Sequence, residues 1–244
     1  MDPDELETIL KQMPGLDVQA AMQQFSFYYQ ELIETNQKYN LTRITDQKEA
    51  YLKHFYDSII PALQWGSTVF RPEMKICDVG TGAGFPGIPL KIIYPDVKLS
   101  LLDSSQKKLQ FLKNLSAQMH LTDVDFVWQR AEEFGQARGR AEFDLVVSRA
   151  VANLRMLSEY CLPLVKTNGY FLAYKGKNGH QELSEAQDLI SLLGGQVQEE
   201  LDLDLLDNDD FRTLFLIKKI KPTPKKYPRS NSQIKADMKG THAK

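Results

Sequence analysis

A glycine-rich segment, Asp78 to Gly87, constrains the fold of this chain more than any other feature. Four glycines, Gly80, Gly82, Gly84 and Gly87, fall within eight positions, after a short apolar run and before a helix-like apolar spacing. Glycine allows a positive φ and lets a ligand approach the backbone without meeting a Cβ. A strand, a glycine turn and a helix in this order predict a binding site for a nucleotide-type cofactor.

The composition is that of a globular protein. The 244 residues suffice for one domain with an extension, and 42% hydrophobic residues exclude a wholly disordered chain. No apolar run approaches the roughly 18 residues of a membrane span, and the acidic N-terminus is unlike a signal or transit peptide. Cys77 and Cys161 lie in apolar segments. We therefore expect two buried free thiols and a cytoplasmic protein without membrane contact.

Basic residues concentrate at the C-terminal end. Residues 218–244 contain nine Lys or Arg and one acid, whereas the rest of the chain contains 21 basic and 31 acidic residues. This asymmetry is typical of polyanion binding and also of a disordered end that improves solubility. We expect a helical extension at residues 1–70, a cofactor-binding domain at 71–220 and a basic, flexible tail at 221–244.

Helices are expected before the glycine segment, and alternating elements after it. Apolar spacing predicts an amphipathic helix over residues 18–32, with Asp17 as its N-cap, and a second helical stretch over residues 46–63. Residues 65–72 are expected to form a linker. Strands are expected at 74–79, 97–102, 124–128, 143–147, 169–174, 196–203 and 213–218. Helices are expected at 86–94, 104–119, 131–137, 153–166 and 179–193.

This order predicts an α/β fold with a doubly wound, mostly parallel seven-stranded sheet and helices on both faces. The short acidic segment between the last two strands leaves no room for a helix, so these strands are expected to be antiparallel. In such a fold the ligand site lies at the carboxyl ends of the strands. The polar residues that follow each strand are therefore the candidate site residues.

Asp103 follows the second strand, about twenty residues after the glycines, where a carboxylate accepts hydrogen bonds from both ribose hydroxyls. Its alternative role is the N-cap of the following helix. Ala131 and Glu132 follow the third strand and are placed to border an adenine ring, unless Glu132 is only a surface charge. We therefore expect Asp103, Ala131 and Glu132 to lie in one site, at the carboxyl ends of the strands.

Three cations complete the candidate site. Arg149 follows the fourth strand and either contacts the cofactor or substrate or forms a structural ion pair with a carboxylate such as Asp78. Lys175 follows the fifth strand beside a glycine, which suits a phosphate contact. Arg212 opens the last strand among acids, as a substrate contact or a charge balance. We expect no metal site.

The cofactor class follows from the residues around the glycines. The segment also fits the dinucleotide fingerprint, so an NAD-dependent oxidoreductase is one alternative. However, Asp78 places an acid next to the first glycines, where it suits a cationic amino-acid group better than a pyrophosphate. Pro86 and Pro89 remove N–H groups that would bind phosphate at the helix start. S-adenosylmethionine, which carries an ammonium, a sulfonium and no phosphate, fits better.

The glycine segment resembles motif I of class I S-adenosylmethionine-dependent methyltransferases, which have a Rossmann-like fold. Its continuation through Phe85 to Leu90 is similar to the ribosomal RNA small subunit methyltransferase G family, also called glucose-inhibited division protein B. Further matching pieces follow in order over roughly residues 36–217. They are Asn40-Leu41-Thr42, His54, Asp57-Ser58, Leu102-Asp103-Ser104, Arg130 to Phe134, Ser148-Arg149-Ala150, Lys175-Gly176 and Arg212.

The resemblance implies N7 methylation of one guanine in the 530 loop of 16S ribosomal RNA, with S-adenosylmethionine as methyl donor and the RNA or small ribosomal subunit as partner. It also implies a cofactor site, whose positions are given at the end of this paragraph. It places Lys175 and Arg212 on the substrate side, with Arg149 as a further candidate there. Guanine N7 has a lone pair and no proton, so we expect no catalytic base. The cofactor positions are Asp78, Gly80, Gly82, Gly84, Phe85, Asp103, Ala131, Glu132 and Arg149.

Two further functions stay open from the residues alone. A methyltransferase for another RNA or a small molecule would share the same cofactor residues, because the fold does not determine the substrate. A non-catalytic RNA-binding assembly factor would share the fold and the basic tail. Methyl transfer in the absence of RNA would identify a small-molecule methyltransferase. RNA binding without methyl transfer to RNA would identify a non-catalytic assembly factor.

Overall fold

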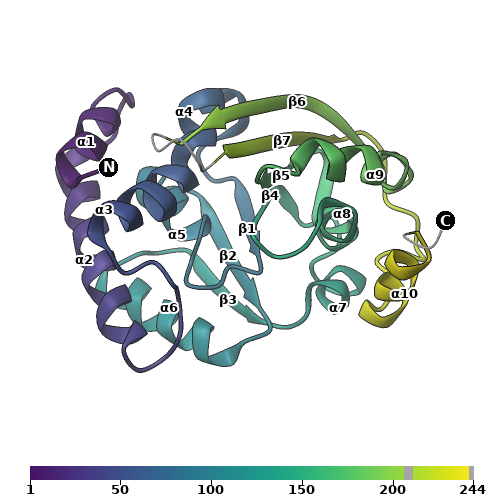
Figure 1. Ribbon diagram of the computed structural model, residues 1–244, viewed down its shortest axis with the longest axis horizontal. Helices are drawn as coiled ribbons and strands as arrows, with labels where there is room; N and C mark the ends of the chain where they lie inside the picture. Colours follow the sequence, from purple (N-terminus) through teal and green to yellow (C-terminus); the bar gives the residue numbers. More distant parts are fainter. Residues whose placement is uncertain (206–210, 242–244) are drawn as a thin grey trace.

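The structure is a computed structural model that describes residues 1–205 and 211–241. A central seven-stranded sheet is covered by helices on both faces (Figure 1). The strand order is β3-β2-β1-β4-β5-β7-β6. β1 to β5 pair in parallel, whereas β7 is antiparallel to both β5 and β6. The expected doubly wound sheet with a final antiparallel pair is confirmed. The strands are β1 (Lys75–Val79), β2 (Lys98–Asp103), β3 (Val124–Trp128), β4 (Phe143–Arg149), β5 (Val165–Lys175), β6 (Gly195–Asp204) and β7 (Phe211–Lys219).

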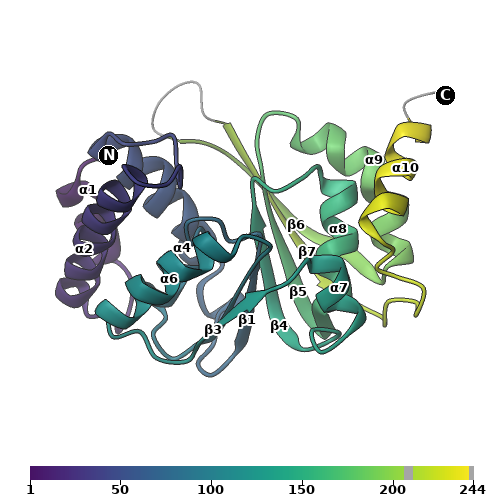
Figure 2. The same cartoon turned by 90° about the horizontal axis from the view of Figure 1, so that it is seen from below.

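Helices lie on both sides of the sheet (Figure 2). The sheet separates two hydrophobic cores, because successive residues of a strand point to opposite faces. Ile76 and Leu145 face the N-terminal helices, whereas their neighbours Cys77 and Val146 face the C-terminal ones. One face carries α1 (Pro3–Leu10), α2 (Val18–Asn36), α3 (Gln47–Ala50), the π-helix η1 (Tyr51–Tyr56), α4 (Asp57–Val69), α5 (Gly87–Ile93) and α6 (Gln106–Gln118). The other carries α7 (Ala131–Gln136), α8 (Leu154–Cys161), the 3-10 turn η2 (Leu162–Leu164), α9 (Gly179–Leu192) and α10 (Asn231–Thr241).

The helices before the sheet follow their sequence pattern closely. The buried residues of α2 are Ala21, Phe25, Tyr28 and Leu32, the expected stripe, and the Asp17 side chain caps the helix. The expected linker at 65–72 is only partly right, because helical structure continues to Val69, although Gly66 has non-helical angles (φ 41°, ψ −128°) that kink α4 there. Trp65 is buried, and its indole N–H donates to Glu199. Burial of this large aromatic side chain stabilises a segment whose Pro and Gly content indicated a helix end.

Both cysteines are free and buried in the second core, as expected from their apolar surroundings. Burial raises the pKa of the Cys77 and Cys161 thiols well above the usual range, so neither is a reactive thiolate at neutral pH. None of the described helices is long and apolar enough to cross a membrane.

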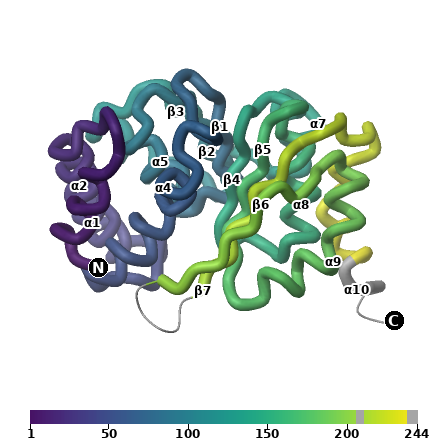
Figure 3. Tube along the Cα trace, turned by 90° about the horizontal axis from the view of Figure 1, so that it is seen from above, coloured from purple at the N-terminus to yellow at the C-terminus, as the bar shows by residue number. Residues whose placement is uncertain are grey.

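The C-terminal segment differs from the expected flexible tail. Residues 223–237 lie against α7, α8 and α9, on the side of the molecule opposite α1 and α2 (Figure 3). Tyr227 and Ile234 are buried in the second core. The prediction of a flexible tail was based on the lysines of this segment. It took no account of the apolar and hydrogen-bonding residues that dock the segment on the domain.

Polar contacts hold the same segment at several points. The Arg140 guanidinium donates to the carbonyl oxygens of Thr223, Pro224 and Tyr227. The Arg229 guanidinium forms a bidentate pair with the Glu159 carboxylate, at 3.0 Å and 2.8 Å, and the Arg229 backbone N–H donates to the same group at 2.7 Å. Glu159 is fully buried, and these contacts offset the cost of removing its carboxylate from water.

We expect Arg229→Ala to lower the free energy of unfolding by about 3–5 kcal/mol, because it leaves the Glu159 carboxylate buried without its guanidinium partner. Urea unfolding followed by circular dichroism measures this change. Lys225→Ala, which removes an exposed cation from the same segment, should leave the transition unchanged. Equal midpoints for the Arg229 variant and the wild type would show that the segment is not docked as described.

Candidate cofactor site and arginine cluster

The glycine turn joins β1 to α5 in the left-handed backbone region. Gly80, Gly82 and Gly84 have φ values of 71°, 62° and 106°, which side chains other than glycine rarely adopt. A Cβ at Gly80 would lie 2.4 Å from the Val151 side chain. At Gly80 the backbone therefore passes where no side chain fits beside Val151.

Asp78 lies beneath this turn and holds it together. One carboxylate oxygen accepts hydrogen bonds from the Thr81 hydroxyl at 2.7 Å and from the Gly87 N–H at 2.9 Å. The other oxygen is buried and has no hydrogen-bond partner among the described residues. Burial is the main cause that raises the pKa of Asp78 to about 6. In the described structure this carboxylate acts on the turn, since it is absent from the wall of the cavity beside it.

Asp103 holds the turn from the side. Its carboxylate accepts from the Gly82 N–H at 3.0 Å and from the Ser105 N–H at 2.8 Å. Asp103 is not the N-cap that the sequence offered as its alternative role, because Ser105 is the N-cap residue of α6 and Asp103 accepts from its N–H. The ribose role stays a prediction. A carboxylate offers about four lone-pair sites, so acceptor capacity remains for a ligand.

A cavity of about 430 Å³ opens beside the turn at the carboxyl ends of the strands. Four of the residues expected to hold the cofactor line it, namely Gly80, Asp103, Ala131 and Glu132. The other residues in its wall are Val79, Leu102, Ser104, Lys108, Gln129, Arg130, Ala150, Val151, Ala152, Met156, Tyr160, Asn231 and Lys235. A second cavity, of about 590 Å³, lies at the opposite ends of the strands, around Lys75 and Lys98, and contains none of the expected site residues.

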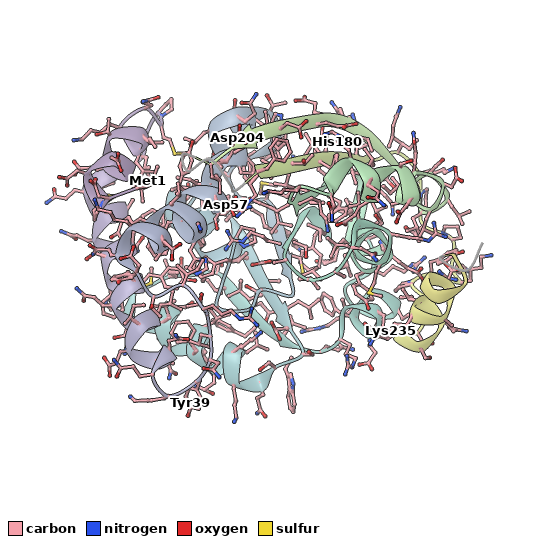
Figure 4. The ribbon with its side chains drawn as sticks, in the orientation of Figure 1. Met1, Tyr39, Asp57, His180, Asp204 and Lys235 are labelled. Atoms are coloured by element: carbon pink, nitrogen blue, oxygen red, sulfur yellow. The ribbon has the colours of Figure 1, made fainter. Side chains whose placement is uncertain are left out.

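Arg149 and Arg212 converge on one buried carboxylate, Asp57 at the start of α4. Arg149 donates from Nη1 to Asp57 at 2.9 Å, and Arg212 donates from Nε to both Asp57 oxygens at 3.1 Å. We call these three residues the arginine cluster. Asp57, and not Asp78, is therefore the carboxylate that pairs with Arg149. Figure 4 shows Asp57 near the centre of the molecule, away from Lys235 at its edge.

Phe85 connects the glycine turn to this cluster. Its ring stacks with Tyr28 of α2 and with His54, at centroid distances of 5.2 Å and 4.4 Å. The Arg149 guanidinium lies 5.2 Å from the same ring, within the range of a cation–π contact. Burial, and then the nearby Arg149 charge, lower the pKa of His54 to about 3. His54 is therefore neutral at physiological pH.

Lys175 makes its contacts within the protein. Its ammonium lies 2.6 Å from the Glu182 carboxylate and donates to the Ala152 carbonyl at 2.8 Å. The side chain is only 9% exposed, so these contacts dominate its surroundings. Because Ala152 lines the cavity, Lys175 positions the loop after β4 in the described structure. This role differs from the phosphate contact that its sequence position indicated.

Comparison with known families decides the group to which this chain belongs. The family model described as rRNA small subunit methyltransferase G matches residues 21–209. Proteins named ribosomal RNA small subunit methyltransferase G are 53% identical in Lactobacillus acidophilus and 50% identical in Staphylococcus aureus. Each alignment covers 85% of this chain, and 86% and 85% of the respective relative. The chain belongs to the rRNA small subunit methyltransferase G family.

Solved structures agree with the fold. A putative sarcosine dimethylglycine methyltransferase from Galdieria sulphuraria is similar with a TM-score of 0.53 at 11% identity, covering 72% of this chain and 88% of that one. Precorrin-6y C5,15-methyltransferase from Geobacter metallireducens has a TM-score of 0.50 at 14% identity, covering 72% and 90%. At these identities the likeness concerns the Rossmann-like methyltransferase fold alone.

Within this family member, the expected site residues fall into two groups. Gly80, Asp103, Ala131 and Glu132 meet at the cavity, whereas Phe85, Arg149 and Arg212 meet at the arginine cluster. Asp78, Gly82 and Gly84 shape the turn between them. Among the described residues, no group of three or more His, Cys, Asp or Glu side chains is placed to hold a metal ion.

Several residues of the site were not found by sequence reasoning. Asp57 was noted only within a matching motif, because its pairing with Arg149 and Arg212 joins residues more than 90 positions apart. Tyr160, Asn231 and Lys235 line the cavity although no motif includes them. The only sequence signal near the last two was the basic character of the C-terminal end.

The pKa of Asp78 predicts a distinct pH dependence of stability. The folded protein binds the proton of this group more tightly than the unfolded chain does, because the folded pKa of about 6 exceeds the usual 3.8. The contribution of Asp78 to stability is therefore present below pH 4, is lost as the pH rises to about 6, and stays constant above. Two pKa units correspond to about 3 kcal/mol.

We expect the stability of wild type relative to Asp78→Asn to fall by about 2 kcal/mol between pH 4 and pH 7. Urea unfolding at four pH values measures this difference. Asp96→Asn, at an exposed position, is the matched control and should follow the wild type throughout. Parallel curves for Asp78→Asn and wild type would contradict the raised pKa.

Proposed function

We propose that this protein transfers a methyl group from S-adenosylmethionine to N7 of a guanine in the 530 loop of 16S ribosomal RNA. The observation that carries the proposal is the cavity beside the glycine turn, in which Gly80, Asp103, Ala131 and Glu132 meet. Membership of the family supports the reaction and the ribosomal RNA substrate. The target base and its position within the RNA follow from the family resemblance.

The residues of the cavity fit an adenosyl cofactor. Asp103 binds the Gly82 and Ser105 N–H groups and retains acceptor sites for two ribose hydroxyls. Ala131 and Glu132 open α7 at the side of the cavity expected to hold the adenine ring. Gly80 offers bare backbone, since even a Cβ there would meet Val151. When bound, S-adenosylmethionine supplies an electrophilic methyl group on a sulfonium.

Asp78 is suited to a cationic end of the cofactor through the charge it places under the turn. One of its oxygens lacks a partner among the described residues, and the carboxylate is mostly ionised above pH 6. An ammonium group near the turn would stabilise that buried negative charge. The proposed contribution of Asp78 to binding is therefore electrostatic and adds to its hydrogen bonds with Thr81 and Gly87.

The arginine cluster is the proposed acceptor side. Asp57 holds the Arg149 and Arg212 guanidinium groups in fixed positions, and Arg149 lies over the Phe85 ring. Guanidinium groups of this kind bind phosphate and guanine oxygen acceptors. Lys175 is a positioning residue, because its ammonium holds the loop at Ala152.

The proposed methyl transfer requires orientation of the guanine base and no proton transfer. Guanine N7 attacks with a lone pair, so the protein needs to align the base with the methyl group, which can lower the barrier by roughly 7–11 kcal/mol. His54, the histidine beside Phe85, is neutral and has a pKa of about 3. It is therefore not a base that titrates near neutral pH.

We expect the full-length protein to transfer tritium from labelled S-adenosylmethionine to 16S RNA, with primer extension mapping the product to one guanine of the 530 loop. Asp103→Ala should reduce cofactor affinity by about tenfold or more, because it removes a charged acceptor of two ribose hydroxyls. Lys225→Ala, outside the cavity, is the control. Label on a small molecule without RNA, or an inert protein that still binds RNA, would support the alternative functions instead.

The rate of methyl transfer in a single turnover should change less than about twofold between pH 6.5 and 8.5, because no base is needed. Asp78 and His54 have pKa values of about 6 and 3, below this range. Burial lowers the pKa of Lys219 to about 7, but Lys219 lies at the other end of β7 from Arg212. Rapid-quench measurements across this range test the expectation, and a steep limb near pH 7 would contradict it.

A further inference from the structure

We infer that the C-terminal segment, residues 223–237, is a wall of the cofactor cavity, and that Asn231 and Lys235 contribute to binding of the adenosyl group. The inference rests on the proposed function, because it takes the bound molecule to be S-adenosylmethionine. It assigns the basic end of the chain a part in cofactor binding, in addition to the RNA or solubility roles that its charge indicated.

The cavity itself places α10 in the site. Asn231 and Lys235 line it together with Gly80, Asp103 and Glu132. The two residues are four apart in a helix, so they lie on one face of α10. Figure 4 shows Lys235 beside α10, at the edge of the molecule. A segment far from the glycine turn in sequence thus shares one cavity with it.

Contacts of Tyr160 locate α10 at the end of the cavity near Glu132. The Tyr160 hydroxyl donates to the Asn231 carboxamide oxygen at 3.3 Å. Burial, and then the charge of Glu132, raise the pKa of Tyr160 to about 12, so the hydroxyl keeps its proton. Asn231 therefore lies next to the residues that are expected to border the adenine ring.

The segment is held firmly enough to serve as a wall. Arg140 binds three of its carbonyl oxygens, and Arg229 pairs with the fully buried Glu159 of α8. Asp237, two residues after Lys235 in α10, pairs with Arg155 of α8 and with Arg229. Ile234 is buried between these contacts. The face with Asn231 and Lys235 is therefore fixed relative to α8.

The chemistry of these two side chains suits a purine nucleoside. The Asn231 oxygen accepts from Tyr160, so its amide NH2 is the group that can donate to a ligand. The Lys235 ammonium only donates hydrogen bonds. An adenine ring presents nitrogen acceptors on its edges, and Asp103 serves the ribose hydroxyls as an acceptor. Donors from α10 and acceptors from β2 thus complement the two parts of an adenosyl group.

The test is calorimetric titration of the full-length protein with S-adenosylhomocysteine, without RNA. We expect Asn231→Ala and Lys235→Ala each to raise the dissociation constant about fivefold, as for the loss of one hydrogen bond. Lys225→Ala is the matched control, since it removes an exposed cation of the same segment outside the cavity, and its affinity should equal that of the wild type. Equal thermal midpoints of all variants would exclude an effect through unfolding.

A second measurement reports on the segment directly. Hydrogen exchange of peptides covering residues 228–237 should slow by more than about threefold when S-adenosylhomocysteine saturates the protein, because a wall residue loses solvent access and mobility on binding. Wild-type affinity in both variants, together with unchanged hydrogen exchange, would overturn the inference. If cofactor binding is still weakened by Asp103→Ala in that case, the proposed cofactor stands. Failure of the wild type to bind S-adenosylhomocysteine would overturn both.

Discussion

The site depends on one glycine turn that two carboxylates hold in place. Asp78 binds the Thr81 hydroxyl and the Gly87 N–H from beneath, and Asp103 binds the Gly82 N–H from the side. The turn has positive φ at three glycines, which glycine adopts readily, and the two carboxylates select this one conformation among those open to it. Its shape then determines where Gly80 borders the cavity and where Phe85 meets Arg149.

The glycine turn lies between two groups of candidate site residues. On one side, the ends of β1 and β2 and the start of α7 form a cavity lined by Gly80, Asp103 and Glu132. On the other side, Asp57 pairs with Arg149 and Arg212, and Arg149 lies over the Phe85 ring. The N-terminal helices take part in this second side, since α2 supplies Tyr28 against Phe85 and α4 supplies Asp57. They are therefore part of the site as well as part of the core.

The charged residues illustrate how burial changes the meaning of a sequence pattern. Lys175 reads as a phosphate ligand beside a glycine, yet its ammonium pairs with Glu182 and holds the Ala152 carbonyl. Arg229 reads as one charge of a basic tail, yet it neutralises the fully buried Glu159. In both cases a buried partner that is distant in sequence decides the role, because a buried charge requires a counter-charge.

The alternation of elements, the parallel sheet with its antiparallel end, the stripe of α2 and the glycine turn could all be predicted from the sequence. Each follows from local periodicity or from the backbone freedom of glycine. Asp103 could be predicted for the same reason, since its distance from the glycines is set along the chain. The family resemblance added the identity of the reaction, which no periodicity carries.

Contacts between distant segments decided the rest. The sequence alone did not pair Asp57 with Arg149 and Arg212, extend α4 through Trp65, or place α10 beside the cavity. These features depend on which side chains the folded sheet brings together and which of them it buries. Local patterns thus determined the elements and the glycine turn, whereas only the tertiary structure decided which charges are paired and which distant segment borders the cavity.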